Sequence, residues 1–419
     1  MVFHVLMAHR FRALGLLFVG TMSLLQGCGG SGGPALPGAG DPGASGGDQD
    51  VGCPRTPASP DRERYVVISH PYDDGGGQSS RFEVLALSKA GHLSVTGKTF
   101  NLGRIAFGDI VFTPDGALGF AAQDDGSLGV FRLAADGTPA VIHSAFSGRG
   151  DFYAQRVVVT PNGGALVVVD GNTPENGGGL YLIRIACDGS LDEVGKIAGA
   201  RTPGDAIFVP GAGDHLVVAG KEVLGTAAGA DAYLLQGLAS TQLVGQADVF
   251  ADDDQLVEDV AVTADGRYAL IADASIWSGL PHRVAAVEVV GDQLRLAQTL
   301  SPLLYEFPAA IAMSPFNNAF LLLTAEAGAD ALVAYGYDPT DAATPFALAG
   351  ELSYQGAAPE MPTAASVIAA GGLKGRVFIA ENLGVRQAQF LVSGAVVDLG
   401  KTSSGSGLGA IVGAIGVQP

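Results

Sequence analysis

The sequence predicts an all-β fold, a seven-bladed β-propeller whose N-terminal blade is closed by the C-terminal strand. An apolar strand, a Thr/Ser-Pro-Asp/Asn-Gly turn and a second apolar strand recur about every fifty residues. Beyond the N-terminus, no long window shows the 3.6-residue apolar period of a helix. A strand-only unit of this length cannot bury both of its faces alone, so its copies must stack on one another as blades do.

The repeated block marks where each blade begins. Its clearest copies are residues 109–116, 156–163 and 259–266, and weaker copies lie at 205–211 and 310–317. Counting the first strand of each block gives blade starts near 109, 156, 205, 259, 310 and 365. Six blades therefore follow one another along the chain.

The seventh blade is expected to combine both ends of the domain. Strands are predicted at 64–69, 82–87 and near 93–100, and this group lacks an inner strand. An apolar run at 409–417 follows the last block and has no partner near it in the sequence. Placed as the inner strand of the N-terminal blade, it completes seven blades and removes an open edge that would template aggregation.

The N-terminus has the pattern of a lipoprotein signal peptide, residues 1–27. Arg10 and Arg12 precede an apolar run at 13–25, and the Leu-Gln-Gly-Cys sequence that ends at Cys28 resembles a bacterial lipobox. The resemblance implies that the Cys28 thiol is acylated, which anchors the chain to a membrane. An ordinary secretory signal is the alternative. Gly29 in place of Asp implies the outer membrane, so we expect a lipid-anchored protein of the bacterial cell envelope.

Two further segments complete the predicted organisation. Residues 28–52 begin with the lipidated Cys and contain almost only Gly, Pro, Ala, Ser and Asp, the composition of a flexible linker. Residues 53–419 form the propeller domain. This domain contains Cys53 and Cys187, which in an oxidising compartment can pair and pin the N-terminal arm beneath the ring. Two buried or free thiols are the alternative.

The chain is strongly acidic, with a formal net charge of −19 at pH 7 from 42 acidic and 23 basic residues. Removing residues 1–27 takes away two Arg and no acid, so the mature chain has 42 acids against 21 bases, a net charge of −21. A negative net charge disfavours binding to nucleic acid and direct adhesion to anionic lipids, and it favours binding to cations and basic partners. The alternative is that the charge only keeps a Gly- and Val-rich monomer soluble.

Many of the acids fall on one predicted face of the ring, here called the top face. The Pro-Asp-Gly turns lie at the opposite end of each blade, so connections between second and third strands and between blades reach the top. A strongly negative top face is expected from Asp73, Asp74, Asp124, Asp125, Asp170, Glu175, Glu222, Asp248, Asp252, Asp253, Asp254, Glu258, Asp273, Glu326, Asp330 and Glu381.

Four polar residues occupy the same position at the start of consecutive inner strands, namely Asp109, Arg156, Asp205 and Asp259. Such positions surround the mouth of the central channel, so three carboxylates and a guanidinium should converge there. Carboxylate oxygens in this arrangement suit Ca²⁺ or Mg²⁺, which makes the three aspartates candidate metal ligands. A structural salt-bridge network around the Arg is the alternative.

One predicted top loop carries two further candidate ligand-binding residues, Trp277 and His282, which offer a stacking surface and a titratable group. A single loop Trp that caps an apolar edge is the alternative. The sequence contains no H-E-x-x-H, C-x-x-C or haem-attachment motif, and the Gly-rich run at 91–99 misses the P-loop spacing by one residue. No catalytic residue is therefore predicted.

The segments 157–170 and 260–273 resemble the repeats of lactonase-like, YVTN-type seven-bladed propellers, and the likeness covers about 64–418. That group includes sugar-lactone hydrolases, surface-layer proteins and binding proteins. The Tyr-Val-Thr-Asn signature is absent and no lactonase site residue can be matched, so the resemblance implies the fold and not the activity. We expect a binding or scaffold module that recognises an envelope protein or glycan through its acidic top face. A lactonase-like hydrolase of a sugar lactone is the alternative.

Overall fold

The computed structural model describes residue 53 and residues 55–419, except 106–107, 150–151, 173–177, 198–202, 213–214, 222–229, 237–241, 251–256, 274–281, 302, 304–306 and 326–329. The predicted signal peptide and linker lie outside these residues. The regular structure of the described part is entirely β-strand. Within that part, no helix has the length and apolar character needed to cross a membrane.

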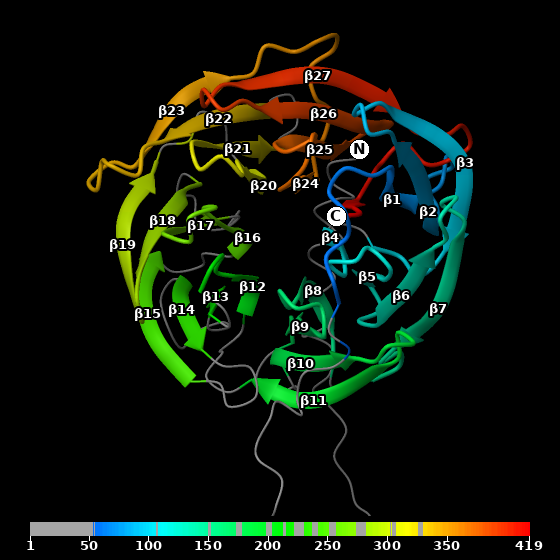
Figure 1. Ribbon diagram of the computed structural model, residues 1–419, viewed down its shortest axis with the longest axis horizontal. Helices are drawn as coiled ribbons and strands as arrows, with labels where there is room; N and C mark the ends of the chain where they lie inside the picture. The colour runs from blue at the N-terminus through cyan, green and yellow to red at the C-terminus, as the bar shows by residue number, and fades with distance from the viewer. Residues whose placement is uncertain are drawn as a thin grey trace, which may run out of the picture. The chain divides into compact units, whose positions relative to one another are not determined.

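The described strands form five four-stranded antiparallel sheets and one eight-stranded sheet (Figure 1). In each four-stranded sheet, strands that are consecutive in the chain are neighbours. The five sheets contain β8 (Ala154–Val159), β9 (Ala165–Asp170), β10 (Gly179–Ile185) and β11 (Leu191–Ile197); β12 (Pro203–Phe208), β13 (Leu216–Lys221), β14 (Ala230–Gln236) and β15 (Gln242–Phe250); β16 (Val257–Val262), β17 (Tyr268–Asp273), β18 (Val284–Val290) and β19 (Gln293–Leu300); β20 (Pro308–Met313), β21 (Ala319–Thr324), β22 (Ala331–Tyr337) and β23 (Phe346–Glu351); and β24 (Ala364–Val367), β25 (Arg376–Glu381), β26 (Gly384–Phe390) and β27 (Val396–Ser403).

The eight-stranded sheet joins the two ends of the described chain. Its order is β3-β2-β1-β28-β4-β5-β6-β7. The C-terminal strand β28 runs antiparallel to β1, with Val67 opposite Gly416, and parallel to β4, with Ile415 opposite Asp109. The expected pairing of the C-terminal strand with the N-terminal group is present, although the strand is shorter than 409–417. The members are β1 (Arg64–Tyr72), β2 (Gln78–Leu87), β3 (Leu93–Asn101), β4 (Gly108–Phe112), β5 (Gly119–Ala122), β6 (Leu128–Leu133), β7 (Pro139–Ala145) and β28 (Ala414–Val417).

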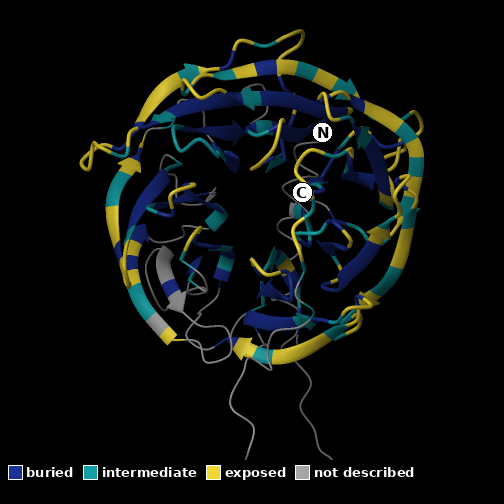
Figure 2. Ribbon diagram, in the orientation of Figure 1, coloured by how far each residue is buried: buried dark blue, intermediate teal, exposed yellow. Residues whose placement is uncertain are grey.

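The first strands of the sheets contact one another in a closed circle. β4 contacts β8, and contacts continue through β12, β16, β20 and β24 to β28, which lies beside β4. Figure 2 shows that the strands next to this circle are mostly buried, whereas the outermost strands carry many exposed residues. The structure is therefore all-β with a propeller-like arrangement, as the repeats predict.

The apolar core lies between neighbouring sheets rather than within one of them. In β9, Leu166 and Val168 pack into the cluster shared with β5 and β6, while Val167 and Val169 pack into the cluster shared with β12 and β13. Successive residues of a strand point to opposite faces, so a strand covered on both faces is apolar throughout. This explains why the second strands read as continuous apolar runs instead of alternating ones.

The repeated turn is held by its own side chains. The buried Thr113 hydroxyl donates to Asp115 Oδ1 at 2.6 Å and accepts from the Leu118 N–H at 3.1 Å. Gly116 has φ of +69°, a left-handed conformation that favours glycine. The Thr160–Asn162 and Thr263–Asp265 pairs repeat the hydroxyl–oxygen contact at 2.8 and 2.6 Å.

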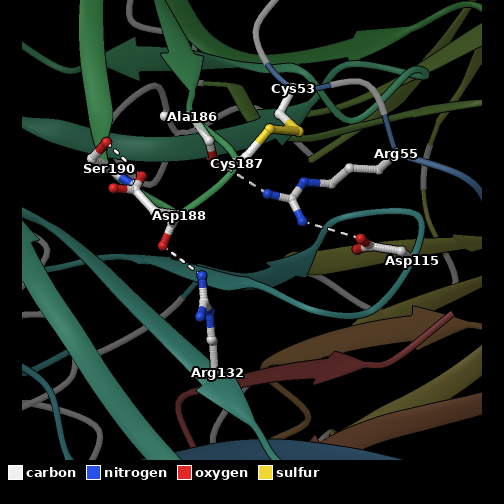
Figure 3. Close-up of a disulfide and its surroundings, with 8 residues drawn as sticks. All are labelled: Cys53, Arg55, Asp115, Arg132, Ala186, Cys187, Asp188 and Ser190. Carbon is white, nitrogen blue, oxygen red and sulfur yellow. Dashed lines mark hydrogen bonds and ion pairs between the residues drawn. A yellow bond between two sulfur atoms is a disulfide. The ribbon is translucent and has the colours of Figure 1, made fainter.

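The N-terminal arm, residues 53–63, runs across these turns as a strap. Cys53 and Cys187 form a disulfide with a Cα–Cα distance of 5.0 Å, which decides between the two alternatives left by the sequence (Figure 3). Beside it, Arg55 binds the Asp115 carboxylate at 3.0 Å and its N–H donates to the Asn162 carbonyl at 3.0 Å. The strap therefore ties the β8–β11 sheet to the β4–β5 turn.

Candidate functional site

The four polar positions at the ring centre are arranged by irregularities in the inner strands. Asp109 lies half-buried in β4, opposite Ile415 of β28. In β8, β12 and β16, the register with the second strand shifts just before Arg156, Asp205 and Asp259, respectively. Such a bulge adds one residue to a strand and re-aims the side chain beside it.

The aspartates bind the backbone of the next inner strand. Asp205 Oδ2 accepts the N–H of Val260 at 2.9 Å, and its Oδ1 accepts the N–H of Ala206 at 2.8 Å. One strand further, Asp259 Oδ2 accepts the N–H of Ile311 at 2.6 Å. These bonds satisfy N–H groups at the strand starts, so both carboxylates help to hold neighbouring sheets together.

Arg156 supplies the positive charge at this centre. Its Nη2 donates to the backbone carbonyl of Glu258 at 2.8 Å. Burial opposes its charge, but the nearby carboxylates, Asp109 and Asp205 foremost, raise the pKa of the guanidinium. Arg156 thus lies within electrostatic reach of the three aspartates, while its described hydrogen bond is to a backbone carbonyl.

The two central carboxylates differ in how they can carry a proton. Burial and the charge of Asp109 raise the pKa of Asp205 to about 6, although Arg156 opposes the shift. Burial and the charges of Asp205 and Asp109 raise the pKa of Asp259 well above its ordinary value. Asp205 accepts N–H groups with both oxygens, whereas Asp259 does so with one. We therefore expect a proton taken up by these carboxylates to reside on Asp259 Oδ1.

The expected Ca²⁺ or Mg²⁺ site is not found at Asp109, Asp205 and Asp259. Within the described residues, no three His, Cys, Asp or Glu side chains are grouped as a metal site would require. The physical reason is that Arg156 already places a positive charge among these carboxylates, and that Asp205 and Asp259 direct oxygens at backbone N–H groups.

We expect Asp259→Asn to raise the Tm at pH 8 by roughly 1–2 °C, the shift that about 1 kcal/mol produces in a domain as long as residues 53–419, given about 2.1 cal/mol/K of unfolding entropy per residue. A raised native pKa means that ionising Asp259 costs stability as the pH rises, and the amide removes this cost while still accepting the Ile311 N–H. The gain should shrink as the pH falls and the wild-type carboxyl becomes protonated. Thermal melts at pH 5 and pH 8 measure it.

Asp205→Asn is the matched control for this experiment. Its amide would turn an NH₂ group towards one of two N–H donors, so it should lower the Tm at both pH values. A wild-type protein whose stability does not fall between pH 5 and pH 8 would refute the assignment of the proton to Asp259.

His282, another predicted ligand residue, has its described contacts away from the centre. His282 is half-buried, with Nδ1 3.1 Å from the Asp273 carbonyl oxygen and its ring edge towards Phe307. Its described contacts are thus with the end of β17 and not with the central carboxylates. Trp277 lies outside the described residues.

Three of the predicted top-face acids are paired with basic side chains, which reduces the negative charge of the face. Asp124 pairs with Arg104, Asp273 with Arg283 at 3.7 Å, and Glu381 with both Arg386 at 3.0 Å and Lys401 at 3.1 Å. Asp170 is buried, whereas Asp73, Asp74, Asp125 and Asp248 are exposed. Outside the described residues lie Glu175, Glu222, Asp252, Asp253, Asp254 and Glu326.

A pocket that the sequence did not reveal lies near these exposed acids. It has a volume of roughly 500 Å³, within the range of ligand sites. The connection between β1 and β2 forms one wall, and residues 407–409 form another. Because the two walls are far apart in the sequence, no local motif marks the pocket.

A buried polar pair holds the two walls together. His70 Nε2 lies 3.3 Å from Glu83 Oε2, and His70 Nδ1 lies 3.0 Å from the Gly409 carbonyl oxygen. The second oxygen of Glu83 accepts the Gly405 N–H at 2.9 Å. Residues 405–409 are therefore attached to β1 and β2 by both members of the pair.

The fold defines a β-propeller-like protein, and its centre holds aspartates bonded to the backbone of the inner strands. No protein-family model and no curated protein sequence matches the chain. Solved structures match it, among them a putative 6-phosphogluconolactonase from Bacteroides fragilis at 12% identity, with a TM-score of 0.63 over 86% of this chain and 99% of that one. A putative 6-phosphogluconolactonase from Bacteroides uniformis matches at 14% identity, with a TM-score of 0.59 over 85% and 99%. A protein from Lactobacillus plantarum matches at 12% identity, with a TM-score of 0.61 over 85% and 100%. At these identities the likeness shows the fold alone.

Proposed function

We propose that this chain is a seven-bladed β-propeller, attached by a lipid on Cys28 to the outer membrane of a bacterial envelope, that binds an envelope partner. The blade count is supported by the eight-stranded sheet, which divides between β28 and β4 into two groups of four strands. With the five other sheets this makes seven groups, and seven apolar clusters lie between them in the described residues.

The observation that supports the binding function is that the central carboxylates already accept hydrogen bonds from the backbone. A general base must reach the proton that it removes. Asp205 uses both oxygens for N–H groups, and Arg156 is surrounded by carboxylates and bonded to a carbonyl. These groups stabilise the ring, which leaves the top-face rim, with its exposed acids and its pocket, as the surface for a partner.

The experiment is crosslinking of the full chain in intact envelopes, followed by membrane fractionation. We expect the chain in the membrane fraction, with a specific protein or glycan attached to it. Cys28→Ser should move the chain into the soluble fraction or leave the signal uncleaved, whereas Ser31→Ala should change neither. Unchanged membrane partitioning and mass of Cys28→Ser would refute the anchor, and the absence of any specific adduct would refute the binding function.

A lactonase-like hydrolase is the second candidate, favoured by the names of two solved structures of the same fold. It is tested by incubating the mature chain with a panel of sugar lactones that includes 6-phosphogluconolactone. Turnover that disappears in Arg156→Ala, in a variant that still folds, would replace the binding function by hydrolysis.

A further inference from the structure

The pocket between the β1–β2 connection and residues 407–409 is lined by polar groups that the fold does not use. The side chains of Asp74, Gln78 and Asn101 are exposed and take part in no hydrogen bond or ion pair among the described residues. Arg81 also lines the pocket, and its Nη1 donates to the Gly407 carbonyl at 3.3 Å, which leaves its other donors available. A carboxylate, two amides and a guanidinium therefore surround one space.

The walls of this space are fixed before any ligand enters. The Asp73 carboxylate closes the connecting loop by accepting the N–H groups of Gly75 at 2.9 Å and Gly77 at 2.7 Å. On the other side, Glu83 and the buried His70 hold residues 405–409. A site whose supports are bonded to one another costs little ordering when it binds.

The composition of the lining excludes most ligand classes. Phosphate or sulfate groups would meet the carboxylates of Asp73 and Asp74, which repel anions. A metal ion would meet the Arg81 guanidinium. An apolar ligand would find only Leu408 as a large apolar contact. Amides, a carboxylate and a guanidinium in one place instead offer both donors and acceptors, which neutral hydroxyl groups need.

We propose that this pocket binds a neutral oligosaccharide, whose hydroxyl groups donate to Asp74 and exchange hydrogen bonds with Gln78, Asn101 and Arg81. None of the residues that line this pocket belongs to the central group around Arg156. The inference rests on the proposed binding function and names the chemical class of the partner.

The test is an array of neutral, phosphorylated and sulfated oligosaccharides probed with the mature chain. We expect retention of at least one neutral oligosaccharide, and at least tenfold weaker binding of that sugar by Asp74→Ala/Gln78→Ala, since each tenfold step corresponds to about 1.4 kcal/mol. The matched control is Asp192→Ala/Gln293→Ala, which removes the same residue types from exposed positions on β11 and β19. This control should bind as the wild type does.

Retention of charged sugars only, no retention at all, or equal binding by the two double variants would each overturn the oligosaccharide site. Thermal melts show that the variants are folded, which the exposure of both side chains leads us to expect. Envelope crosslinking separates the two proposals. A captured protein with a negative array would reject the sugar site and keep the binding function, whereas a positive array without any adduct would keep the sugar site and reject a stably attached envelope partner.

Discussion

Deletion of residues 409–419 is expected to make the domain aggregate and become sensitive to protease. β28 lies between β1 and β4, so its loss leaves unpaired N–H and C=O groups on both strands. The deletion also removes Gln418, whose side-chain amide donates to the Gly116 carbonyl at 2.9 Å and whose N–H donates to Tyr65 at 3.0 Å. Size-exclusion chromatography and limited proteolysis measure the effect.

A point substitution tests the same closure without removing residues. A Cβ at Gly416 would lie 2.2 Å from the Ile110 carbonyl oxygen, so Gly416→Ala should force β28 away and cost about 1–3 kcal/mol of unfolding free energy. At Gly336 in β22 the nearest atom is the Ala347 oxygen at 3.9 Å, so Gly336→Ala is a matched control with little expected loss. If the protein that lacks residues 409–419 stays monomeric and melts at the wild-type temperature, the ring must close in another way.

Cys53→Ser is expected to lower the free energy of unfolding by about 4 kcal/mol. The disulfide links residues that are 134 positions apart, and in the chain-entropy account the effect of a crosslink grows with the length of the loop that it closes. Denaturant titration under oxidising conditions measures the loss. Without the disulfide, the N-terminal strap is held by non-covalent contacts such as those of Arg55 with Asp115 and Asn162.

Two comparisons separate the disulfide from the substitution itself. The double variant Cys53→Ser/Cys187→Ser should lose no more stability than the single variant, since either change removes the same bond. A reducing agent should lower the stability of the wild type by a similar amount and leave the double variant unchanged. Equal stability of the oxidised and reduced wild type would contradict the proposed contribution of the strap.

The sequence predicted those parts of the fold that depend on neighbouring residues. The Thr-Pro-Asp-Gly turn forms through contacts within a few positions, such as Thr113 to Asp115, so its repetition located the first strand of each sheet. Apolar runs such as 166–169 showed which strands are covered on both faces. The pairing of the C-terminal strand followed from counting strands. The N-terminal group lacked an inner strand, and the C-terminal strand had no other partner in a propeller-like ring.

The sites depended on contacts that no local pattern contains. Asp124 was counted as a free acid, but Arg104 reaches it from the preceding connection between sheets. The pocket requires His70 and Gly409, which are 339 positions apart, and His70 lies just beyond the strand predicted at 64–69. The strand bulges that re-aim Asp205 and Asp259 likewise have no residue signature, so the central positions were predicted and their bonds to the next strand were not.

The union of both chain ends in one sheet has a consequence for how the protein folds. The N–H of Tyr65 meets the side chain of Gln418, which is 353 positions further along the chain. Contacts between such distant positions slow folding, because the chain loses much freedom before they form. During synthesis β1 and β4 emerge early and wait with unsatisfied edges until β28 arrives, a state in which nascent chains are prone to misassembly. The ring therefore cannot close before β28 has left the ribosome.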